Sequence, residues 1–421
     1  MAEVSINGVP HKPVPGSLAN GISPDRLRTI VQDSHLNFLI GAGTPSSFFG
    51  LLGNVEDALT QVAESTAADD VKAVVKASIQ AYFFDSVLTP NLKVVERHAD
   101  TEDVLTSYAK FLRTLNRILL KRHSSILAKQ ANIFTTNVDM VFEVALEQMG
   151  IDFSDGFSGK IRPRFDLGDF NTIRLRMASR FEQRSEVPVF NLVKIHGSVG
   201  WLQEHRSPER TEIIFDHGLS LVSEVQRALD AARGDLIAIT DGDQVDAAAL
   251  IPKAPTSAVP ATVARFTDAY DRLGIVNPDK RKFATTVLNE TYYELIRRFA
   301  NELEKENSVL FVHGFSFRDE HLRDVVVRAA RSNPTLQVIV FCYSRTDLAE
   351  YQKLIPDTDV KNTNILFVVP PEPEDGAAEM KASLDVVTSD YFVPIIADKF
   401  PSTDQRIELD IRIPREEGTV V

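Results

Sequence analysis

Hydrophobic and polar positions follow two patterns along the chain. Short apolar runs that end at a glycine or a polar loop predict buried strands. These runs cover residues 36–40, 132–135, 191–195, 308–313, 336–343 and 364–369. Stretches with helical spacing of the apolar positions predict helices. These stretches cover residues 24–33, 54–88, 101–130, 140–149, 283–307, 322–332 and 346–354. Strands that alternate with helices indicate βαβ units, so we expect an α/β fold with a parallel sheet.

Weaker patterns mark insertions and terminal extensions. The first residues are rich in proline and glycine, which favours an irregular arm up to the helix start at Ser23 and Pro24. Alternating apolar and charged positions at 406–413 predict an edge strand. We therefore expect an arm at 1–24, a core at 25–50 and 131–370, a helical insertion at 51–130, a second, irregular insertion at 205–282, and a C-terminal extension at 371–421.

Composition excludes several classes of protein. The 421 residues are 43% hydrophobic and 25% charged, which is ordinary for a globular chain. Cys342 is the only cysteine, so neither an internal disulfide nor a cysteine zinc site is expected. The chain has no apolar run of about 18 residues and no secretory signal pattern, so we expect a cytoplasmic protein without a membrane span.

The charge pattern disfavours direct binding of nucleic acid. The formal net charge is −13, which opposes broad, non-specific contact with phosphate backbones. The four arginines within residues 174–184 stand beside glutamates at positions 182 and 186. We interpret this stretch as a solvated face and expect no contact with DNA.

A glycine turn follows the first predicted strand at Gly41, Ala42 and Gly43. Two glycines at this position permit a tight turn and a close approach of the backbone to a pyrophosphate. The dehydrogenase fingerprint expects a third glycine where this chain has Ser46, and an acid at the tip of the next strand, whereas Glu64 lies in a helical stretch. The pattern disfavours hydride transfer, and by itself it is equally compatible with a turn that holds no ligand.

Three further polar or glycine loops follow predicted strands. They comprise Thr135-Thr136-Asn137-Val138-Asp139, His196-Gly197 and Gly314-Phe315-Ser316-Phe317. In open α/β sheets, ligands bind outside the carboxyl ends of the strands. We therefore expect the four loops to converge on one crevice.

Taken in order, these blocks resemble the sirtuins. That family has a Gly-Ala-Gly loop, a Thr-Gln-Asn-x-Asp loop, a catalytic His-Gly and a later Gly-Thr-Ser loop. The corresponding blocks here are 41–44, 135–139, 194–198 and 314–316, within residues 36–345. The resemblance implies a Rossmann-like parallel sheet of the sirtuin large-domain type and NAD as the substrate.

Two departures from the sirtuin pattern change the expected activity. The two Cys-x-x-Cys pairs of the deacylases are missing, and Pro45-Ser46-Ser47-Phe48-Phe49 stands where Pro-Asp-Phe-Arg is usual. The chain is more similar to the sirtuin-like NAD hydrolases of bacterial antiphage systems. That similarity implies an NAD⁺ glycohydrolase without zinc, a homo-oligomer, and a HerA-type DNA-translocating ATPase as partner. The alternatives are a protein deacylase or ADP-ribosyltransferase, and a non-catalytic subunit that senses NAD.

The resemblance also suggests a role for each site residue. His196 would be the general base, since an imidazole titrates near neutral pH. Asn137 would hold the ribose hydroxyls or the attacking water, and Asp139 would accept from the nicotinamide carboxamide. The dinucleotide would be bound by Gly41, Ala42, Gly43, Thr44, Thr136, Asn137, Asp139, Gly314, Ser316 and, with less support, Ser344.

Purely structural roles remain open for the same residues. His196 could bond a neighbouring carbonyl, and Asn137 and Asp139 could cap the helix that begins near Met140. Ser316 could cap the helix that begins near Asp319. We interpret residues 319–321, Asp-Glu-His, as a solvated first helical turn and not as a metal site.

Overall fold

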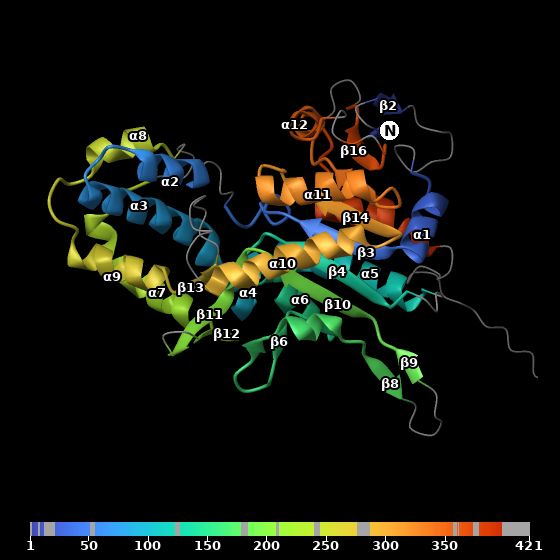
Figure 1. The fold of residues 1–421 in the computed structure, drawn as a ribbon, viewed down its shortest axis with the longest axis horizontal. Coiled ribbons are helices and arrows are strands. Elements are labelled where there is room, and N and C mark those ends of the chain that lie inside the picture. Colours follow the sequence, from blue (N-terminus) through green and yellow to red (C-terminus); the bar gives the residue numbers. More distant parts are fainter. Residues whose placement is uncertain are drawn as a thin grey trace, which may run out of the picture.

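A nine-stranded sheet forms the centre of the computed structural model (Figure 1). Seven of its strands are parallel and run in the order β16-β15-β14-β3-β4-β10-β5. Their bounds are β3 His35–Ile40, β4 Gln130–Thr135, β5 Phe153–Ser154, β10 Val189–Lys194, β14 Ser308–His313, β15 Gln337–Phe341 and β16 Ile365–Pro371. The structure describes residues 2–6, 9–11, 22–50, 55–122, 127–177, 184–207, 210–239, 245–275, 287–356, 360, 362–373 and 379–397. The predicted α/β fold with a Rossmann-like parallel sheet is confirmed.

The strand order reverses at the centre of the sheet. From β3 the chain proceeds through β4 to β10 on one side, then returns to β14 on the other side of β3 and continues outward through β15 and β16. This is the order of doubly wound dinucleotide-binding domains, in which the ligand crevice lies where the order reverses. The relevant edge is therefore formed by the carboxyl ends of β3 and β14.

Helices cover both faces of the sheet because successive strand residues point to opposite sides. Phe38 packs edge-on against Phe111 of α5 at 5.5 Å between ring centroids. On the other face, Phe134 packs against Phe299 of α10 at 4.8 Å. The helices nearest the sheet are α1 Pro24–Asp33, α5 Glu102–Leu120, α6 Val141–Met149, α10 Val287–Glu304, α11 Glu320–Ser332 and α12 Asp347–Leu354.

The predicted helix α1 has the expected start, since the Ser23 hydroxyl accepts from the Arg26 amide. The expected end of α6 is also present, with Gly150 at φ +59°. The predicted helix over 101–130 is too long: α5 ends at Leu120 and β4 begins at Gln130. The helical spacing of apolar positions continues into the segment between α5 and β4, so the predicted end of the helix lies too far along the chain.

Both ends of the described chain differ from expectation. The arm is not wholly irregular, because β1 Ala2–Ile6 pairs antiparallel with β16, and β2 Val9–His11 pairs with β1. An open sheet edge offers backbone groups to any extended segment, whatever its side-chain pattern. At the other end, α13 Leu384–Val387, η8 Thr388–Phe392 and α14 Pro394–Ala397 pack on the core, where Phe392 lies 5.2 Å from Phe311. The strand predicted at 406–413 lies outside the described residues.

The two predicted insertions pack against each other in a helical lobe beside the sheet (Figure 1). The Thr89 hydroxyl donates to Gln226 at 2.8 Å, and the Ile237 amide donates to the Ser78 hydroxyl at 2.9 Å. The helices of the first insertion are α2 Val55–Glu64, α3 Asp69–Phe83, η1 Phe84–Leu88, α4 Pro90–Glu96 and η2 Ala99–Thr101. Those of the second are α7 Ser220–Ala232, η4 Arg233–Asp235, α8 Ala247–Leu250, η5 Ile251–Lys253 and α9 Ala261–Tyr270.

The expectation that 205–282 is irregular is wrong for its described residues, which contain helices and strands. A second sheet has the order β13-β11-β12-β7-β6. Its bounds are β6 Phe157–Ser158, β7 Arg164–Phe165, β11 Gly197–Ser207, β12 Arg210–Phe215 and β13 Leu273–Ile275. The remaining elements are η3 Leu167–Asn171 and the paired strands β8 Leu175–Met177 and β9 Arg184–Glu186. The prolines at 252, 255 and 260 lie in η5 and in the connection from η5 to α9, and they do not prevent helices on either side.

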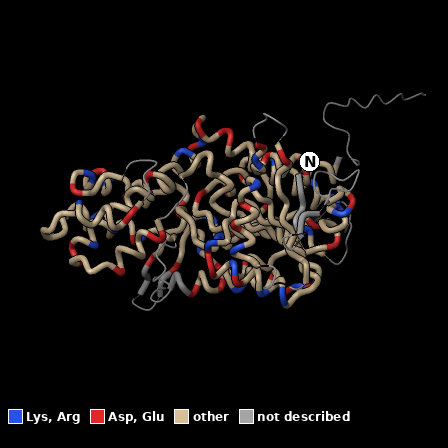
Figure 2. Tube along the Cα trace, turned by 90° about the horizontal axis from the view of Figure 1, so that it is seen from above, with Lys and Arg blue, Asp and Glu red and all other residues tan. Residues whose placement is uncertain are grey.

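Acidic and basic positions are interspersed along the described trace (Figure 2). Arg174, one of the arginines in the basic stretch, pairs with Asp152 at 2.6 Å. Within the described part of the chain, no helix combines the length and the apolar character needed to cross a membrane.

Candidate functional site

Two glycine loops meet where the strand order reverses. The Gly41 amide donates to the His313 carbonyl at 3.0 Å, and the Gly43 amide donates to the Gly314 carbonyl at 2.9 Å. A Cβ atom on Gly41 would lie 2.4 Å from the Gly314 oxygen. On Gly314, where φ is +66°, it would lie 2.4 Å from the Thr44 amide nitrogen. Both positions therefore require glycine, because the two backbones are in contact.

The turn expected to hold phosphate has most of its amides engaged. In addition to the bonds of Gly41 and Gly43, the Thr44 amide donates to the Gly41 carbonyl at 3.0 Å. Within the described part of the chain, Ala42 has the one amide of these four that makes no main-chain hydrogen bond. The Thr44 hydroxyl lies 2.8 Å from Nδ1 of His313. In this conformation the turn is closed against the β14 loop.

The loop after β4 places Asn137 beside the glycine turn. The Thr135 hydroxyl donates to the Ile40 carbonyl at 2.8 Å and accepts from the Asn137 amide at 3.0 Å. The Asn137 side-chain amide donates to the Gly41 carbonyl at 3.2 Å, and the Thr136 amide donates to Ile40 at 3.4 Å. Asn137 is 6% exposed, and its Oδ1 has no hydrogen-bond partner among the described residues. A buried acceptor without a partner is costly, so it is a candidate contact for a ligand or water.

Asp139 is buried at the start of α6. Its Oδ1 accepts from the Val141 amide at 3.0 Å, which confirms the helix-start role left open by the sequence. The amide of Met140, which lies between Asp139 and Val141, donates to Asn91 of α4 at 2.9 Å. The first insertion therefore supports the loop, and one oxygen of Asp139 already has a structural task.

His196 follows β10 and forms a pair with Asp319. The Ile195 amide donates to the Thr135 carbonyl at 2.9 Å, which brings this loop beside that of Asn137. Nε2 of His196 lies 3.1 Å from Oδ2 of Asp319, and the two side chains are 26% and 24% exposed. His196 is thus half-buried and paired with a carboxylate, not with a neighbouring carbonyl.

The pair with His196 determines the protonation of Asp319. Burial by itself raises the pKa of Asp319, but the contacts with His196, the hydrogen bond from the Leu322 amide and, least, the charge of His321 together outweigh it, and the net pKa lies below its ordinary value. An ionised Asp319 accepts the proton on Nε2, so Nδ1 of the neutral imidazole carries the lone pair. This arrangement fixes the orientation of the imidazole.

Asp319 corrects two interpretations made from the sequence. Its Oδ1 accepts from the Leu322 amide at 3.1 Å, so Asp319, and not Ser316, caps α11. Its carboxylate also contacts His196, so the stretch 319–321 is not simply a solvated turn. Sequence reasoning missed this role, although an acid directly after a strand-end loop was a usable signal.

A buried ion pair lies under the Asp139 and His196 loops. Lys194 Nζ lies 3.1 Å from Oε1 of Glu143 and also donates to the Asp139 carbonyl. Burial raises the pKa of Glu143 to about 7, while the charge of Lys194 opposes that rise. Burial and, less strongly, the charge of Asp139 raise the pKa of the Tyr108 hydroxyl, while interaction with the Asn137 side chain opposes that rise. The ion pair between Lys194 and Glu143 links β10 to α6.

Ser316 and Ser344 differ in their surroundings. Ser316 is exposed on the β14 loop, and its hydroxyl accepts from the Arg318 amide at 3.4 Å. The Ser344 hydroxyl donates to Asp347 at 2.8 Å and contacts Thr346 at 2.8 Å, while its amide also donates to Asp347. Ser344 is therefore committed to the turn before α12, whereas Ser316 is accessible.

Direct contacts connect most of the predicted site residues at one edge of the sheet. Asn137 contacts Gly41, which belongs to the turn that contacts Gly314, and His196 contacts Asp319 at the end of the Gly314 loop. The four loops thus converge as expected from the strand ends. Within the described residues, no group of three or more His, Cys, Asp or Glu side chains could hold a metal ion.

The fold and this edge define a doubly wound α/β protein with a polar site at the reversal of strand order. No protein-family model matches the chain, and no curated protein matches it. The function is therefore argued from the geometry of the site.

Proposed function

We propose that the chain is an NAD⁺ glycohydrolase that cleaves the nicotinamide–ribose bond. The observation that carries the proposal is the combination of the His196–Asp319 pair and the unpartnered oxygen of Asn137, on two loops joined by the bond from the Ile195 amide to the Thr135 carbonyl. A base, a neutral acceptor and a glycine turn at the reversal of strand order are the parts that hydrolysis of a dinucleotide requires.

His196 would act on the attacking water. Its Nδ1 accepts one proton as the water oxygen bonds to the ribosyl carbon, and the bond from that carbon to nicotinamide breaks. The electron pair of the broken bond stays on the pyridine nitrogen, so nicotinamide leaves neutral and ADP-ribose forms. Asp319 stabilises the imidazolium that results. The Asn137 oxygen would accept from the water or from a ribose hydroxyl.

Binding of the pyrophosphate requires a change in the glycine turn. Only Ala42 has an amide outside the main-chain bonds of the turn, whereas a phosphate cradle uses several amides. We propose that Gly43 and Thr44 exchange their partners for phosphate oxygens when NAD binds. The closed turn would then keep the hydrolase inactive until it is opened.

Incubation of the purified protein with NAD⁺, followed by chromatography of the products, tests the proposal. We expect nicotinamide and ADP-ribose in equal amounts, without any acylated peptide. His196→Ala should lower turnover by a factor of roughly 100 or more, and Asn137→Ala should also lower it. His98→Ala is the matched control, since the His98 side chain is 53% exposed and belongs to none of the four loops of the site.

Three outcomes would refute parts of the proposal. Binding of NAD without cleavage would indicate a sensor, and O-acyl-ADP-ribose formed from acetylated peptide would indicate a deacylase. Unchanged turnover in both site variants would refute the assignment of the site. By resemblance we also propose a role in antiphage defence, homo-oligomerisation and a HerA-type ATPase partner, so the assay is run with and without such an ATPase.

A further inference from the structure

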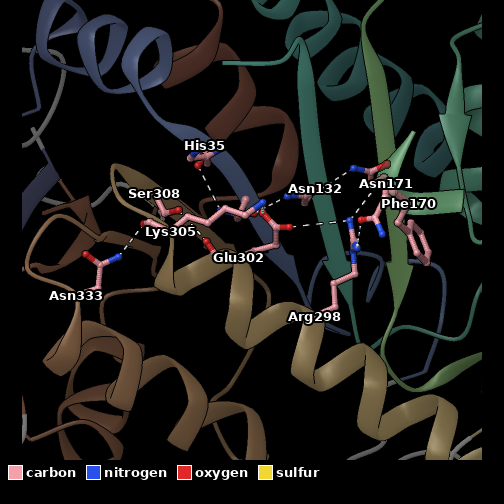
Figure 3. A network of polar contacts seen from close by, with 11 residues as sticks. His35, Asn132, Phe170, Asn171, Arg298, Glu302, Lys305, Ser308 and Asn333 are labelled. Atoms are coloured by element: carbon pink, nitrogen blue, oxygen red, sulfur yellow. Dashed lines mark hydrogen bonds and ion pairs between the residues drawn. The ribbon is translucent and has the colours of Figure 1, made fainter. Parts of the chain in front are cut away.

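A polar cavity of about 230 Å³ lies at the other end of the sheet, beside the amino ends of the central strands. Asn132 of β4 and Asn191 of β10 line it from the sheet. Arg298 and Glu302 project toward it from α10, and Lys305 follows that helix (Figure 3). The volume corresponds to about eight water molecules at the density of the liquid. Because these residues lie at the opposite strand ends from the His196 site, the cavity is a separate feature.

The charges around the cavity favour an anion. Arg122, Arg298 and Lys305 carry three positive charges, and Glu302 is the one acid in the lining. Glu302 is itself engaged with Lys305 at 2.6 Å and lies 4.0 Å from Arg298. Burial lowers the pKa of His35, so this residue adds little positive charge. Within the lining, three cations and one carboxylate leave an excess of two positive charges, which a dianion in the cavity would balance. Asp33 and Glu186 act on Arg122 from outside the lining.

Polar atoms in the lining have unused hydrogen-bonding capacity. Nε of Arg122 and Nε of Arg298 are buried donors without a partner among the described residues. The Arg122 terminal nitrogens donate to carbonyls of Val31 and Ala128. Those of Arg298 donate to Asn171 at 3.0 Å and to the Phe170 carbonyl at 3.1 Å. Both guanidinium groups are thus held in place by their terminal nitrogens, and the buried Nε of each has no partner among the described residues.

The asparagine ladder supplies an unused acceptor. Asn132 donates to Asn37 at 2.8 Å, and Asn191 donates to Asn132 at 2.8 Å. The ladder ends at Oδ1 of Asn191, which has no partner among the described residues although Asn191 is only 2% exposed. Buried polar groups are normally paired, and the three residues that carry these unpaired atoms all line the same cavity, which favours a ligand there.

We propose that this cavity binds a small phosphate monoester that carries hydroxyl groups. A phosphate monoester has a charge of about −1.5 to −2 at neutral pH, which matches the excess charge. Guanidinium groups suit phosphate oxygens, and the Asn191 oxygen requires a donor, which a sugar hydroxyl supplies. A dicarboxylate matches the charge but offers no hydroxyl donor unless it is substituted.

Thermal denaturation of the full chain with ribose 5-phosphate tests the proposal at constant ionic strength. We expect a saturable rise in the midpoint temperature, because a ligand that binds only the folded state stabilises it. Inorganic phosphate should act more weakly, and ribose and succinate should have no comparable effect. Lys305→Gln and Arg298→Lys should each weaken the apparent affinity roughly tenfold, as expected for a lost charged contact.

Lys353→Gln, on the exposed face of α12, is the control for loss of a lysine charge and should bind as the wild type does. Lys305 is 45% exposed, so its substitution is not expected to impair folding. Absence of any saturable shift means that the cavity holds only water and overturns the proposal. Equal binding by Lys305→Gln, Arg298→Lys and the wild type, or an equal response to succinate, also overturns it. None of these readouts depends on NAD turnover.

Discussion

The two nitrogens of His196 have different tasks because one of them is bonded to Asp319. An ionised carboxylate selects the tautomer with the proton on Nε2 and fixes the orientation of the ring. Asp319 does this while it caps α11 through its other oxygen. A substitution can therefore remove the charge and keep the cap.

Asp319→Asn should lower the rate of NAD cleavage by a factor of roughly 10–100. Asparagine retains an oxygen for the Leu322 amide but loses the negative charge that stabilises the imidazolium. Steady-state kinetics with NAD⁺ measure this loss of rate.

The control for Asp319→Asn is Asp324→Asn on the same helix, where the Asp324 side chain is 78% exposed. It should leave the rate unchanged. A purely structural Asp319 would lower stability in Asp319→Ala and leave the rate of Asp319→Asn at the wild-type value.

Glu143 gives the folded protein a component of stability that depends on pH. Its pKa is raised to about 7, above the ordinary value, chiefly by burial. The stabilisation is therefore complete below the unfolded pKa of about 4.3 and is lost as the pH rises through about 7. Relative to the wild type, Glu143→Gln should become more stable between about pH 5 and about pH 8, by roughly 2–3 kcal/mol at most.

The measurement for Glu143→Gln is the difference in midpoint temperature between variant and wild type at several pH values. Other titrating groups cancel in this difference. A difference that stays constant across the range would contradict the raised pKa of Glu143.

At the scale of elements, the carboxyl ends of β3 and β14 are held together by main-chain contacts of two glycine loops. The Gly314 loop is constrained both by its positive φ and by the Thr44 backbone. Gly150, at the end of α6, has a similar φ of +59°, but a Cβ there would meet nothing within 4 Å. A substitution at Gly150 therefore measures the free-energy cost of the positive φ alone. A substitution at Gly314 measures that cost together with the cost of the backbone contact.

Gly150→Ala should destabilise the protein by about 1 kcal/mol, the cost of placing a side chain at positive φ. Gly314→Ala should cost roughly 2–4 kcal/mol, because the added methyl group also collides with a backbone atom. Gly234→Ala, which has neither constraint, should be close to neutral. Thermal denaturation measures all three, and equal losses in Gly150→Ala and Gly314→Ala would contradict the close contact.

At the scale of the whole molecule, segments far apart in the chain form one helical lobe. Arg233, after α7, makes two bonds to Asp85 in η1, at 2.8 and 3.0 Å. The side chains are 50% and 39% exposed, so solvent screens the pair. This ion pair joins the two insertions, but it contributes little to the free energy of unfolding.

A double-mutant cycle on Asp85 and Arg233 should give a coupling free energy below about 1 kcal/mol. Asp85→Ala, Arg233→Ala and the double variant are compared by denaturation. The coupling should decrease with added salt, as expected of an exposed pair. A coupling of several kcal/mol that is insensitive to salt would show that the two insertions depend on this contact.

The sequence predicted the parts of the molecule whose cause is local. Two helix ends are fixed by residues close by in the chain: Ser23 and Pro24 at the start of α1, and Gly150 at the end of α6. Short apolar runs indicate the buried strands. It also placed polar loops at the ends of these strands. The candidate site residues from Gly41 to Gly314 follow from that placement.

Contacts between distant segments were beyond the sequence pattern. The pairing of His196 with Asp319 joins residues 123 positions apart, by their numbers. The strand at 2–6 depends on the open edge of β16, and the cavity lined by Arg122, Asn191 and Arg298 exists only once three elements meet.

The sequence by itself determined where the chain turns, which segments are buried and which loops are polar, since these depend on neighbours within a few residues. Only the tertiary structure decided which loops touch, which carboxylate orients the imidazole of His196, and where charges surround a cavity. The physical reason is that hydrogen bonds and burial act over a few ångströms in space, and folding brings together residues that the chain keeps far apart.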